Sequence, residues 1–456
     1  MTFKNIDPEI ILKYDKQIPR YTSYPTAPHF KEEKSDQLYR KWIEEIPTNS
    51  RISLYFHIPF CEKLCWYCGC NTQIINHYSP VERYLIYLKK EISIISNLIK
   101  SKNLKICHIH FGGGSPTIID PLNFKDLFSH IRNNFNIIEN AEIAIEVDPR
   151  NIDEHKAKIY EKVGINRVSF GVQDFDLNVQ KLINRVQPFE LVEKICTLFR
   201  KYNISNINFD FIYGLPGQTL EIITKNINLI QKLDPDRIAF FGYAHVPWVK
   251  KYMRFIKDED LPNATDRIDL YNIISQDLHK IGYQSIGLDH FAKKDSDIIK
   301  QLKKRELKRN FQGYSTDEAN ILIGIGISSI SYLPSGYAQN TTKNIPYPKF
   351  IDENQLPISK IIKISTEDKI RKLIIDEIMC YLNVNLNKFI TEFNLKDNYF
   401  DQELLDLRTL ESEGLIKIYN KKITINPKTP QISRVTASFF DQYFDNASNN
   451  KHSKAI

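Results

Sequence analysis

Four cysteines lie close together in the segment Cys61-Glu-Lys-Leu-Cys65-Trp-Tyr-Cys68-Gly-Cys70, directly after a β-rich run at 52–58. Thiolates are soft ligands that suit iron-sulfur clusters, zinc and copper(I), so the spacing has to separate these alternatives. Cys61, Cys65 and Cys68 follow a CxxxCxxC pattern, which lets one loop give a thiolate to each of three irons of a 4Fe-4S cluster. The fourth iron would stay open, and we expect Cys70 to point away from the cluster.

The alternative is a four-cysteine zinc site, but such sites usually take two CxxC pairs from separate turns. The other three cysteines, Cys107, Cys196 and Cys380, are scattered and are interpreted as small buried hydrophobes. No secretory signal is visible at the N-terminus. The cysteine pattern therefore predicts metal or redox chemistry in the cytoplasm rather than disulfides.

Short β-rich runs alternate with amphipathic segments from residue 51 onward, which is typical of βα units around a parallel sheet. Strands are expected at 52–58, 106–111, 142–147, 167–172, 207–213 and 237–243. Helices are expected at 81–101, 124–134, 156–163, 189–202 and 220–233. Six units are too few for a closed eight-stranded barrel, so the fold class is α/β with a partial (β/α)6 barrel.

Polar and glycine residues follow the expected strands at their carboxyl ends, where loops of parallel sheets converge. Gly112 to Gly114 follow the second strand, Glu146 ends the third, Gln173 the fourth and Asp210 the fifth. Glycines let the backbone approach a cofactor, and carboxylates can accept hydrogen bonds from ribose hydroxyls. The alternatives are an ordinary turn and a helix cap. The pattern predicts one active site on one rim.

Three units are expected along the chain: an N-terminal arm over 1–50, the barrel with an extension over 51–345, and a small, mostly helical domain over 346–456. The order helix, strand, turn, strand near 402–425 resembles a winged helix. Such a module can bind DNA or cap a neighbouring domain; no basic recognition helix stands out, so we expect no nucleic acid. No apolar run of 18 residues is present, so no membrane span is expected.

The composition is that of an ordinary globular protein. The chain has 456 residues, of which 42% are hydrophobic and 26% charged, with a net charge of +7. These values exclude a disordered, collagen-like or disulfide-scaffold protein. The mild basic excess fits an anionic small molecule as readily as nucleic acid, so charge alone identifies no partner.

A three-cysteine cluster that opens a partial α/β barrel is the arrangement of the radical S-adenosylmethionine (SAM) superfamily. Within it, the chain closely resembles the oxygen-independent coproporphyrinogen III oxidase family over about 19–340. The motifs that carry this resemblance are Arg20-Tyr-Thr-Ser-Tyr-Pro-Thr26, Tyr55-Phe-His-Ile-Pro-Phe-Cys61, Phe111-Gly-Gly-Gly-Ser-Pro-Thr117, Glu146-Val-Asp-Pro-Arg150, Gly171-Val-Gln-Asp174, Tyr213-Gly-Leu-Pro216, Tyr243-Ala-His-Val-Pro247, Asp289-His-Phe-Ala292 and Arg309-Asn-Phe-Gln-Gly-Tyr314.

The resemblance implies oxidative decarboxylation of two propionates of coproporphyrinogen III to vinyl groups in haem biosynthesis, through a 5′-deoxyadenosyl radical. It implies a 4Fe-4S cluster on Cys61, Cys65 and Cys68, and two SAM molecules. The first SAM would contact Tyr55, Gly113, Glu146 and Ile330; the second would contact Tyr67, Gly114, Ser115, Gln173, Arg185, Asp210 and Ala244. The catalytic residues implied are Tyr55, Glu146 and Gln312.

Three positions depart from the commoner family pattern: Tyr67 stands where Phe is usual, Ser115 where Thr is usual, and Gly242 where Asn is frequent. Tyr67 keeps the aromatic ring, and Ser115 keeps the hydroxyl. Independently of the resemblance, Arg185 suits a role in binding the methionyl carboxylate of SAM, because a guanidinium fork matches a carboxylate. The segment 20–26 is expected to act either as a lid over the site or as a packed arm.

The nearest alternative function is that of the related haem chaperone, which binds and transfers haem. Members of the haem chaperone family lack a cysteine at the Cys70 position and the 20–26 motif, whereas both are present here. A radical methyltransferase is a third possibility, disfavoured by the 309–314 motif. The resemblance further implies an electron donor and an electron acceptor, neither of which the sequence identifies, and a monomer.

Overall fold

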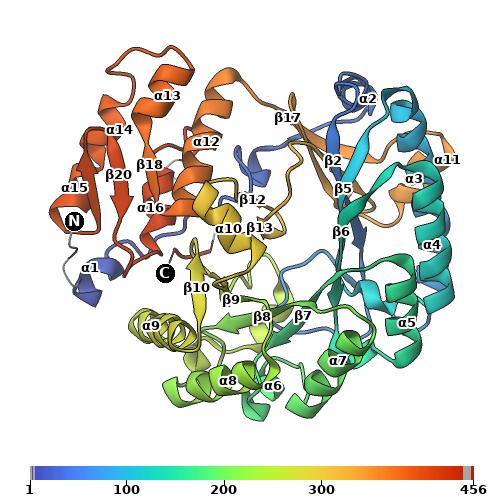
Figure 1. The fold of residues 1–456 in the computed structure, drawn as a ribbon, viewed down its shortest axis with the longest axis horizontal. Helices are drawn as coiled ribbons and strands as arrows, with labels where there is room; N and C mark the ends of the chain where they lie inside the picture. The colour runs from blue at the N-terminus through green and yellow to red at the C-terminus, as the bar shows by residue number, and fades with distance from the viewer. Residues whose placement is uncertain (1–2, 4–5, 445–452, 456) are drawn as a thin grey trace.

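The computed structural model describes residues 3, 6–444 and 453–455, and a strongly curved sheet runs through its centre. Seven neighbouring strands of this sheet are parallel (Figure 1). In spatial order they are β14 (Leu322–Ile325), β2 (Arg51–Ile58), β5 (Lys105–Gly113), β6 (Ile137–Val147), β7 (Arg167–Gln173), β8 (Asn206–Tyr213) and β9 (Arg237–Gly242).

The six expected strands are confirmed, and they neighbour one another in chain order from β2 to β9. The seventh parallel strand, β14, was missed. It has only four residues, and Gly324 interrupts its apolar pattern. Its partner β2 lies far away in the sequence, so only the tertiary structure reveals the pairing of Leu322 with Ser53.

Helices cover the outer face of the parallel strands (Figure 1). The main ones are α3 (Ser79–Ile99), α4 (Pro121–Asn134), α5 (Glu154–Val163), α7 (Phe189–Lys201) and α8 (Leu220–Leu233), all at the expected places. Helix α5 illustrates how they begin and end: the Asp153 side chain accepts from the Lys156 amide, and Gly164 closes the helix with a φ of 92°.

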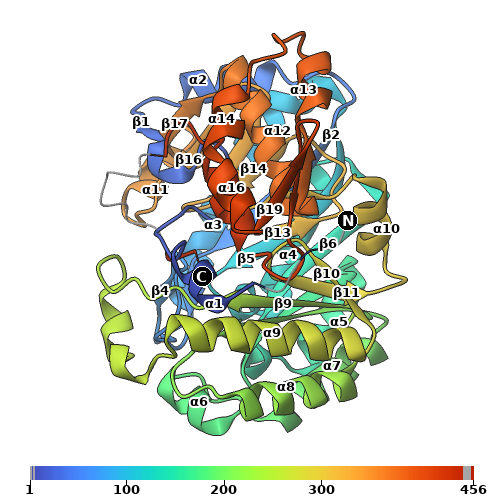
Figure 2. The same ribbon diagram turned by 90° about the vertical axis from the view of Figure 1, so that its left-hand side faces the viewer.

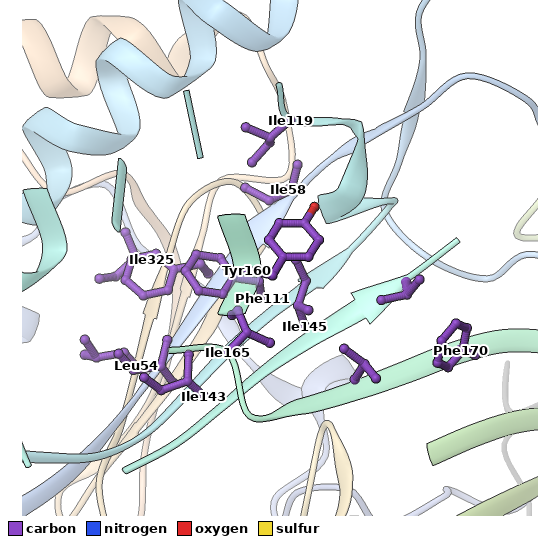
Figure 3. Packing of buried hydrophobic residues seen from close by; sticks show 14 of the residues in the cluster. Leu54, Ile58, Phe111, Ile119, Ile143, Ile145, Tyr160, Ile165, Phe170 and Ile325 are labelled. Atoms are coloured by element: carbon purple, nitrogen blue, oxygen red, sulfur yellow. The ribbon is translucent and has the colours of Figure 1, made fainter. Parts of the chain in front are cut away.

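The largest apolar core lies between the parallel strands and these helices. Figure 3 shows Phe111 of β5, Ile145 of β6 and Phe170 of β7 together with Tyr160 of α5. Ile325 of β14 belongs to the same cluster, which ties the missed strand to the barrel. Continuous burial of this kind is typical of strands covered on both faces.

Antiparallel strands extend the sheet at both edges. Beyond β14 lie β15 (Ile330–Leu333), β16 (Gly336–Asn340), β17 (Ile358–Lys363) and β1 (Lys31–Glu32); beyond β9 lie β11 (His290–Lys293) and β10 (Tyr283–Ile286). Strand β17 thus joins the large sheet although it follows the expected boundary at 345. The unit boundaries stay a prediction, and the units 1–50 and 346–456 include ends outside the described residues.

The C-terminal part forms a second core with a three-stranded sheet, on one side of the barrel (Figure 1). Its elements are α12 (Thr366–Tyr381), β18 (Asn383–Asn385), α13 (Leu386–Glu392), α14 (Asp401–Asp406), α15 (Arg408–Ser412), β19 (Ile416–Tyr419), β20 (Lys422–Ile425) and α16 (Ile432–Ser438). This matches the expected helical, winged-helix-like domain. Ile18, Tyr21 and Tyr24 of the N-terminal arm are buried in the same core.

The remaining elements connect these parts. They include α1 (Pro8–Leu12), α2 (Gln37–Glu44), β3 (Phe60–Cys61), β4 (Gln73–Ile74), α6 (Leu177–Leu182), α9 (Ala264–Lys280), α10 (Asp297–Lys304), β12 (Lys308–Asn310), β13 (Gly313–Ser315) and α11 (Pro346–Asp352). Within the described ranges, none of the helices combines the length and the apolar character that crossing a membrane requires.

Candidate active site

A cavity of about 710 Å³ lies at the carboxyl ends of the parallel strands. Many of the residues predicted for the site line it: Tyr55, Tyr67, Cys68, Gly113, Glu146, Ala244, Gln312 and Ile330. They come from β2, β5, β6, β15 and the loops between strands. The others do not line it, namely Cys61, Cys65, Gly114, Ser115, Gln173, Arg185 and Asp210. The residues predicted to contact the first SAM thus all line one cavity, whereas most of those predicted to contact the second SAM lie outside its lining.

The cysteine loop leaves β2 and is held at both ends. Strand β3 carries Cys61 and pairs with β4, which closes the loop. The Cys61 sulfur accepts a hydrogen bond from the Thr72 hydroxyl at 3.1 Å, and Arg185 Nη1 lies 3.6 Å from the Cys65 sulfur. Tyr252 donates its hydroxyl to the Cys68 carbonyl at 2.6 Å. The loop is thus fixed by groups from three other parts of the chain.

The protonation of the thiols differs along this loop. Burial raises the pKa of Cys61 to about 12, whereas a hydrogen bond from Cys70 lowers the pKa of Cys68 to about 7. Cys70 is exposed and lines the cavity beside Cys68. Its thiol is thus directed at Cys68, and not away from the three predicted ligands as the sequence led us to expect.

The donor set fits an iron-sulfur cluster. Three soft donors share one loop, and the guanidinium of Arg185 beside Cys65 offsets the negative charge that thiolates bring. In the part of the chain that the structure describes, no group of three or more His, Cys, Asp or Glu side chains has the arrangement to hold a single metal ion. A four-iron cluster instead takes each thiolate on a different iron, and three cysteines on one loop can supply these.

Glu146 is the carboxylate that faces the cavity. Its Oε2 accepts from the Gly113 amide and its Oε1 from His110 Nε2, both at 3.1 Å. Burial alone would raise the pKa of Glu146, but the interaction with His110 and the hydrogen bond from the Gly113 amide outweigh it, so that the pKa is lowered. Glu146 is therefore an anion that is ready to accept hydrogen bonds from a ligand.

Tyr55 and His57 form a hydrogen-bonded pair on β2. His57 Nε2 lies 2.9 Å from the Asn71 carbonyl, and because a carbonyl only accepts, Nε2 carries the proton. His57 Nδ1 then accepts from the Tyr55 hydroxyl at 3.1 Å. Sequence reasoning missed His57 and His110 as site residues. A signal was present, since each lies two positions from another polar or aromatic residue on one strand face, Tyr55 and His108 respectively.

Arg185 lies beside the cysteine loop. It donates to the Gly171 carbonyl at 2.6 Å, and its Nη1 is 3.4 Å from Asp148 Oδ2. Burial would raise the pKa of Asp148, but Arg185 and Arg150 lower it to about 2. The charge of Arg185 is thus shared between the Asp148 carboxylate and the Cys65 sulfur, and the part played by Asp148 was not anticipated from the sequence.

The other residues predicted for the second SAM lie outside the lining of the cavity. Asp210 accepts from Ser169 at 2.8 Å and from Asn208 at 2.9 Å, and burial raises its pKa. Gln173 is buried with a φ of 69°. Ser115 bonds Thr117 at 3.1 Å. A Cβ added to Gly114 would come within 2.6 Å of the Phe60 carbonyl oxygen, so this glycine lets β5 approach the cysteine loop.

The N-terminal arm reaches the same cavity. Arg20 lines it and donates to the Gly242 carbonyl at 2.8 Å. The next residue, Tyr21, is buried and donates to Asp441 at 3.1 Å in the C-terminal core. The segment therefore combines a packed arm with one residue that closes the cavity wall.

Comparison with known proteins agrees with this geometry. Residues 55–230 match the model of the radical SAM superfamily. The chain is 38% identical to the oxygen-independent coproporphyrinogen III oxidase of Bradyrhizobium diazoefficiens over 97% of its own length and 98% of that protein, and 39% identical to that of Helicobacter pylori J99 over 96% and 97%.

A solved structure is similar over the same length. It is the coproporphyrinogen III oxidase of Escherichia coli, described as a radical SAM enzyme, with a TM-score of 0.90 and 34% identity. The similarity covers 97% of this chain and 100% of that one. Sequence and fold thus agree from end to end, and the chain belongs to the oxygen-independent coproporphyrinogen III oxidase family of radical SAM enzymes.

Proposed function

We propose that this protein oxidatively decarboxylates two propionate side chains of coproporphyrinogen III to vinyl groups, giving protoporphyrinogen IX for haem biosynthesis. Each propionate loses one hydrogen atom, one electron and CO2, and the remaining two carbons form the vinyl group. The observation that carries the proposal is the cavity beside the cysteine loop, in a chain that matches proteins of this name over their whole length.

Cys61, Cys65 and Cys68 are the proposed ligands of a 4Fe-4S cluster. Such a cluster, when bound, supplies the electron that cleaves SAM to the 5′-deoxyadenosyl radical. The chain contributes the thiolates, and the Arg185 guanidinium beside Cys65 lowers the cost of gathering their charge. Cys70 is left outside the ligand set.

Two SAM molecules are proposed. Tyr55, Gly113, Glu146 and Ile330 share one cavity, which supports a first molecule there. The carboxylate of Glu146 is the expected acceptor for ribose hydroxyls, because His110 and Gly113 hold it in place. The second molecule is assigned by resemblance to Tyr67, Gly114, Ser115, Gln173, Arg185, Asp210 and Ala244.

The cavity also suits a tetrapyrrole and a radical. Ile212, Phe241 and Phe311 line it, and apolar walls exclude water that would quench a radical. Gln312 lines it as well, and its buried Nε2 has no hydrogen-bond partner among the described residues. We assign Gln312 to positioning the substrate through that amide.

Three further points complete the proposal. The protein is expected to act as a monomer and to need an electron donor and an electron acceptor that remain to be identified. A site built on reduced thiols suits the reducing conditions of the cytoplasm.

The test is to incubate anaerobically reconstituted, reduced protein with SAM and coproporphyrinogen III. We expect the tetrapyrrole mass to fall by two CO2 and the accompanying hydrogens, with 5′-deoxyadenosine formed in step. Deoxyadenosine without any change in the tetrapyrrole would refute the substrate but keep the radical chemistry. A stable complex with haem would instead support the chaperone.

A further inference from the structure

Four arginines from distant parts of the chain meet behind one wall of the main cavity. They are Arg20 of the arm, Arg267 of α9, Arg309 of β12 and Arg434 of α16. They line a small cavity of about 30 Å³ that shares Arg20, Gly242 and Tyr243 with the main cavity. Figures 1 and 2 show α9 and α16 on the same side of the molecule, and Ser453 to Ala455 complete the lining. We refer to these four residues as the arginine cluster.

The charges of this cluster are not balanced. Among the described residues that line the small cavity, Asp289 is the carboxylate, and it already accepts from His290 Nδ1 at 2.7 Å. Its nearest contact with the cluster is Arg309 Nη1 at 4.0 Å. Lys454, at the edge, pairs with Asp15 at 3.0 Å. Four guanidinium groups therefore face one carboxylate, which leaves a positive excess inside the protein.

Neutral carbonyl groups orient the arginines. Arg20 donates to Gly242, Arg267 to Tyr243 at 3.0 Å, and Arg434 to Pro19 at 3.2 Å and Lys454 at 2.8 Å. Backbone carbonyls fix the direction of a guanidinium without neutralising its charge. The cluster is thus preorganised but electrostatically incomplete.

Several donors of the cluster have no acceptor. Arg309 is 7% exposed, yet its Nε and Nη1 lack hydrogen-bond partners among the described residues, and so does Arg267 Nε. A buried charged donor without an acceptor is strongly unfavourable, so native proteins normally satisfy such groups. Both residues line the small cavity, so an anion bound there is the acceptor that we expect for these donors.

We infer that the arginine cluster binds a propionate carboxylate of the tetrapyrrole substrate, an inference that rests on the function proposed above. A carboxylate matches a guanidinium fork through two parallel hydrogen bonds. The small cavity cannot hold a tetrapyrrole ring, but Arg20, Gly242 and Tyr243 line both cavities, so a propionate of a ring in the main cavity would reach the cluster past these residues. One propionate would thus be anchored while the ring is held for reaction.

The methionyl carboxylate of SAM is the rival anion. SAM is proposed to lie at the cysteine loop, and none of residues 61–70 lines the small cavity. The shared wall is formed instead by Arg20, Gly242 and Tyr243, which the resemblance assigns to neither SAM. This placement favours the substrate, and the experiment below separates the two ligands.

The experiment measures the affinity of anaerobic holoenzyme, with SAM present, for coproporphyrin III and for its tetramethyl ester, by fluorescence. Arg309→Gln and Arg267→Gln are compared with the wild type and with Arg254→Gln, a change at an exposed arginine that does not line either cavity. We expect each cluster variant to bind coproporphyrin III ~10-fold or more weakly, because a hydrogen bond to a charged group is lost. Arg309→Lys should recover part of the loss.

The ester decides whether the carboxylate is what the cluster recognises. Because the ester has no carboxylate, wild type and cluster variants should bind it equally. Equal weakening for both ligands, or wild-type affinity of both cluster variants for coproporphyrin III, would overturn the inference. So would a loss confined to SAM affinity, which would assign the cluster to the methionyl carboxylate.

Failure of the proposed function gives a different result. If the wild type forms deoxyadenosine but neither converts coproporphyrinogen III nor binds coproporphyrin III, the substrate is wrong. If the wild type converts the substrate while the cluster variants bind as tightly as it does, only the present inference fails. Unfolding temperatures measured without porphyrin identify a variant that has simply lost its fold.

Discussion

Replacing Gly113 by alanine tests the construction of the rim directly. Gly113 is at the end of β5 with a φ of +113°, in a region that residues with a side chain rarely adopt. An added Cβ would lie 2.6 Å from Cε1 and 2.7 Å from Nδ1 of His57. These separations are far below van der Waals contact, so either the backbone or the His57 ring must move.

The size of the effect follows from the backbone strain at the positive φ and from the overlap of the added Cβ with His57. A strained backbone at a residue other than glycine costs about 1–3 kcal/mol, and overpacking costs about 1–3 kcal/mol. The ring cannot yield freely, because Nε2 bonds the Asn71 carbonyl, Nδ1 bonds Tyr55 and the His57 carbonyl accepts from Tyr84. We expect Gly113→Ala to lower the free energy of unfolding by about 2 kcal/mol or more and to weaken SAM binding as Tyr55 moves.

The measurement pairs two glycines of the same cavity. Gly69→Ala is the matched control, because its added Cβ would meet nothing within 4 Å and it also lines the cavity. Urea denaturation gives the free energy of unfolding of both variants under anaerobic conditions, and equilibrium dialysis gives the SAM affinity. If both alanine variants unfold and bind SAM alike, the steric reasoning about Gly113 is wrong.

Glu146→Gln keeps the shape of the side chain but removes its charge, so SAM affinity measured by dialysis should fall ~10-fold or more; an unchanged affinity would show that Glu146 binds no ribose. Cys65→Ala should lose cluster iron and visible absorbance on reconstitution, whereas Cys70→Ala should keep both; equal loss would make Cys70 a ligand. Burial raises the pKa of Glu91 from 4.5 to about 7, despite hydrogen bonds from Tyr347, Asn340 and Gly326. The folded state therefore holds an extra proton between these values, and about 3 kcal/mol of stability is lost as pH rises from 4.5 to 7. Urea midpoints of Glu91→Gln should lack this fall; an identical fall would place its origin elsewhere.

The parallel strands and the rim residues could be predicted because their signals are local. Each of the six expected strands, β2 and β5 to β9, is a short apolar run of its own, and the residues at its end occupy the rim by topology alone. Glu146 follows from this rule without any knowledge of His110 or Gly113. The partners that hold its charge could not be predicted, since they depend on which strands become neighbours.

Strand β14 shows what local signals miss. A Cβ on Gly324 would come within 2.8 Å of the Ile330 carbonyl oxygen, so the glycine is needed for β14 and β15 to pass closely. In the sequence, the same glycine weakens the strand pattern. The feature that hides the strand therefore also brings Ile330 to the cavity, and the residue could be assigned by resemblance but not by periodicity.

The arginine cluster could not be predicted from the sequence, because its members lie far apart along the chain. From Arg20 to Arg434, successive members are separated by 247, 42 and 125 positions. Each arginine alone resembles an ordinary surface cation, and the net charge of +7 does not locate the excess. The excess becomes visible only where the arm, α9, β12 and α16 meet around Asp289. Burial of the N-terminal arm in the C-terminal core is what brings Arg20 to Arg434. The packing of the two chain ends would thereby complete a binding site, rather than merely cover the barrel.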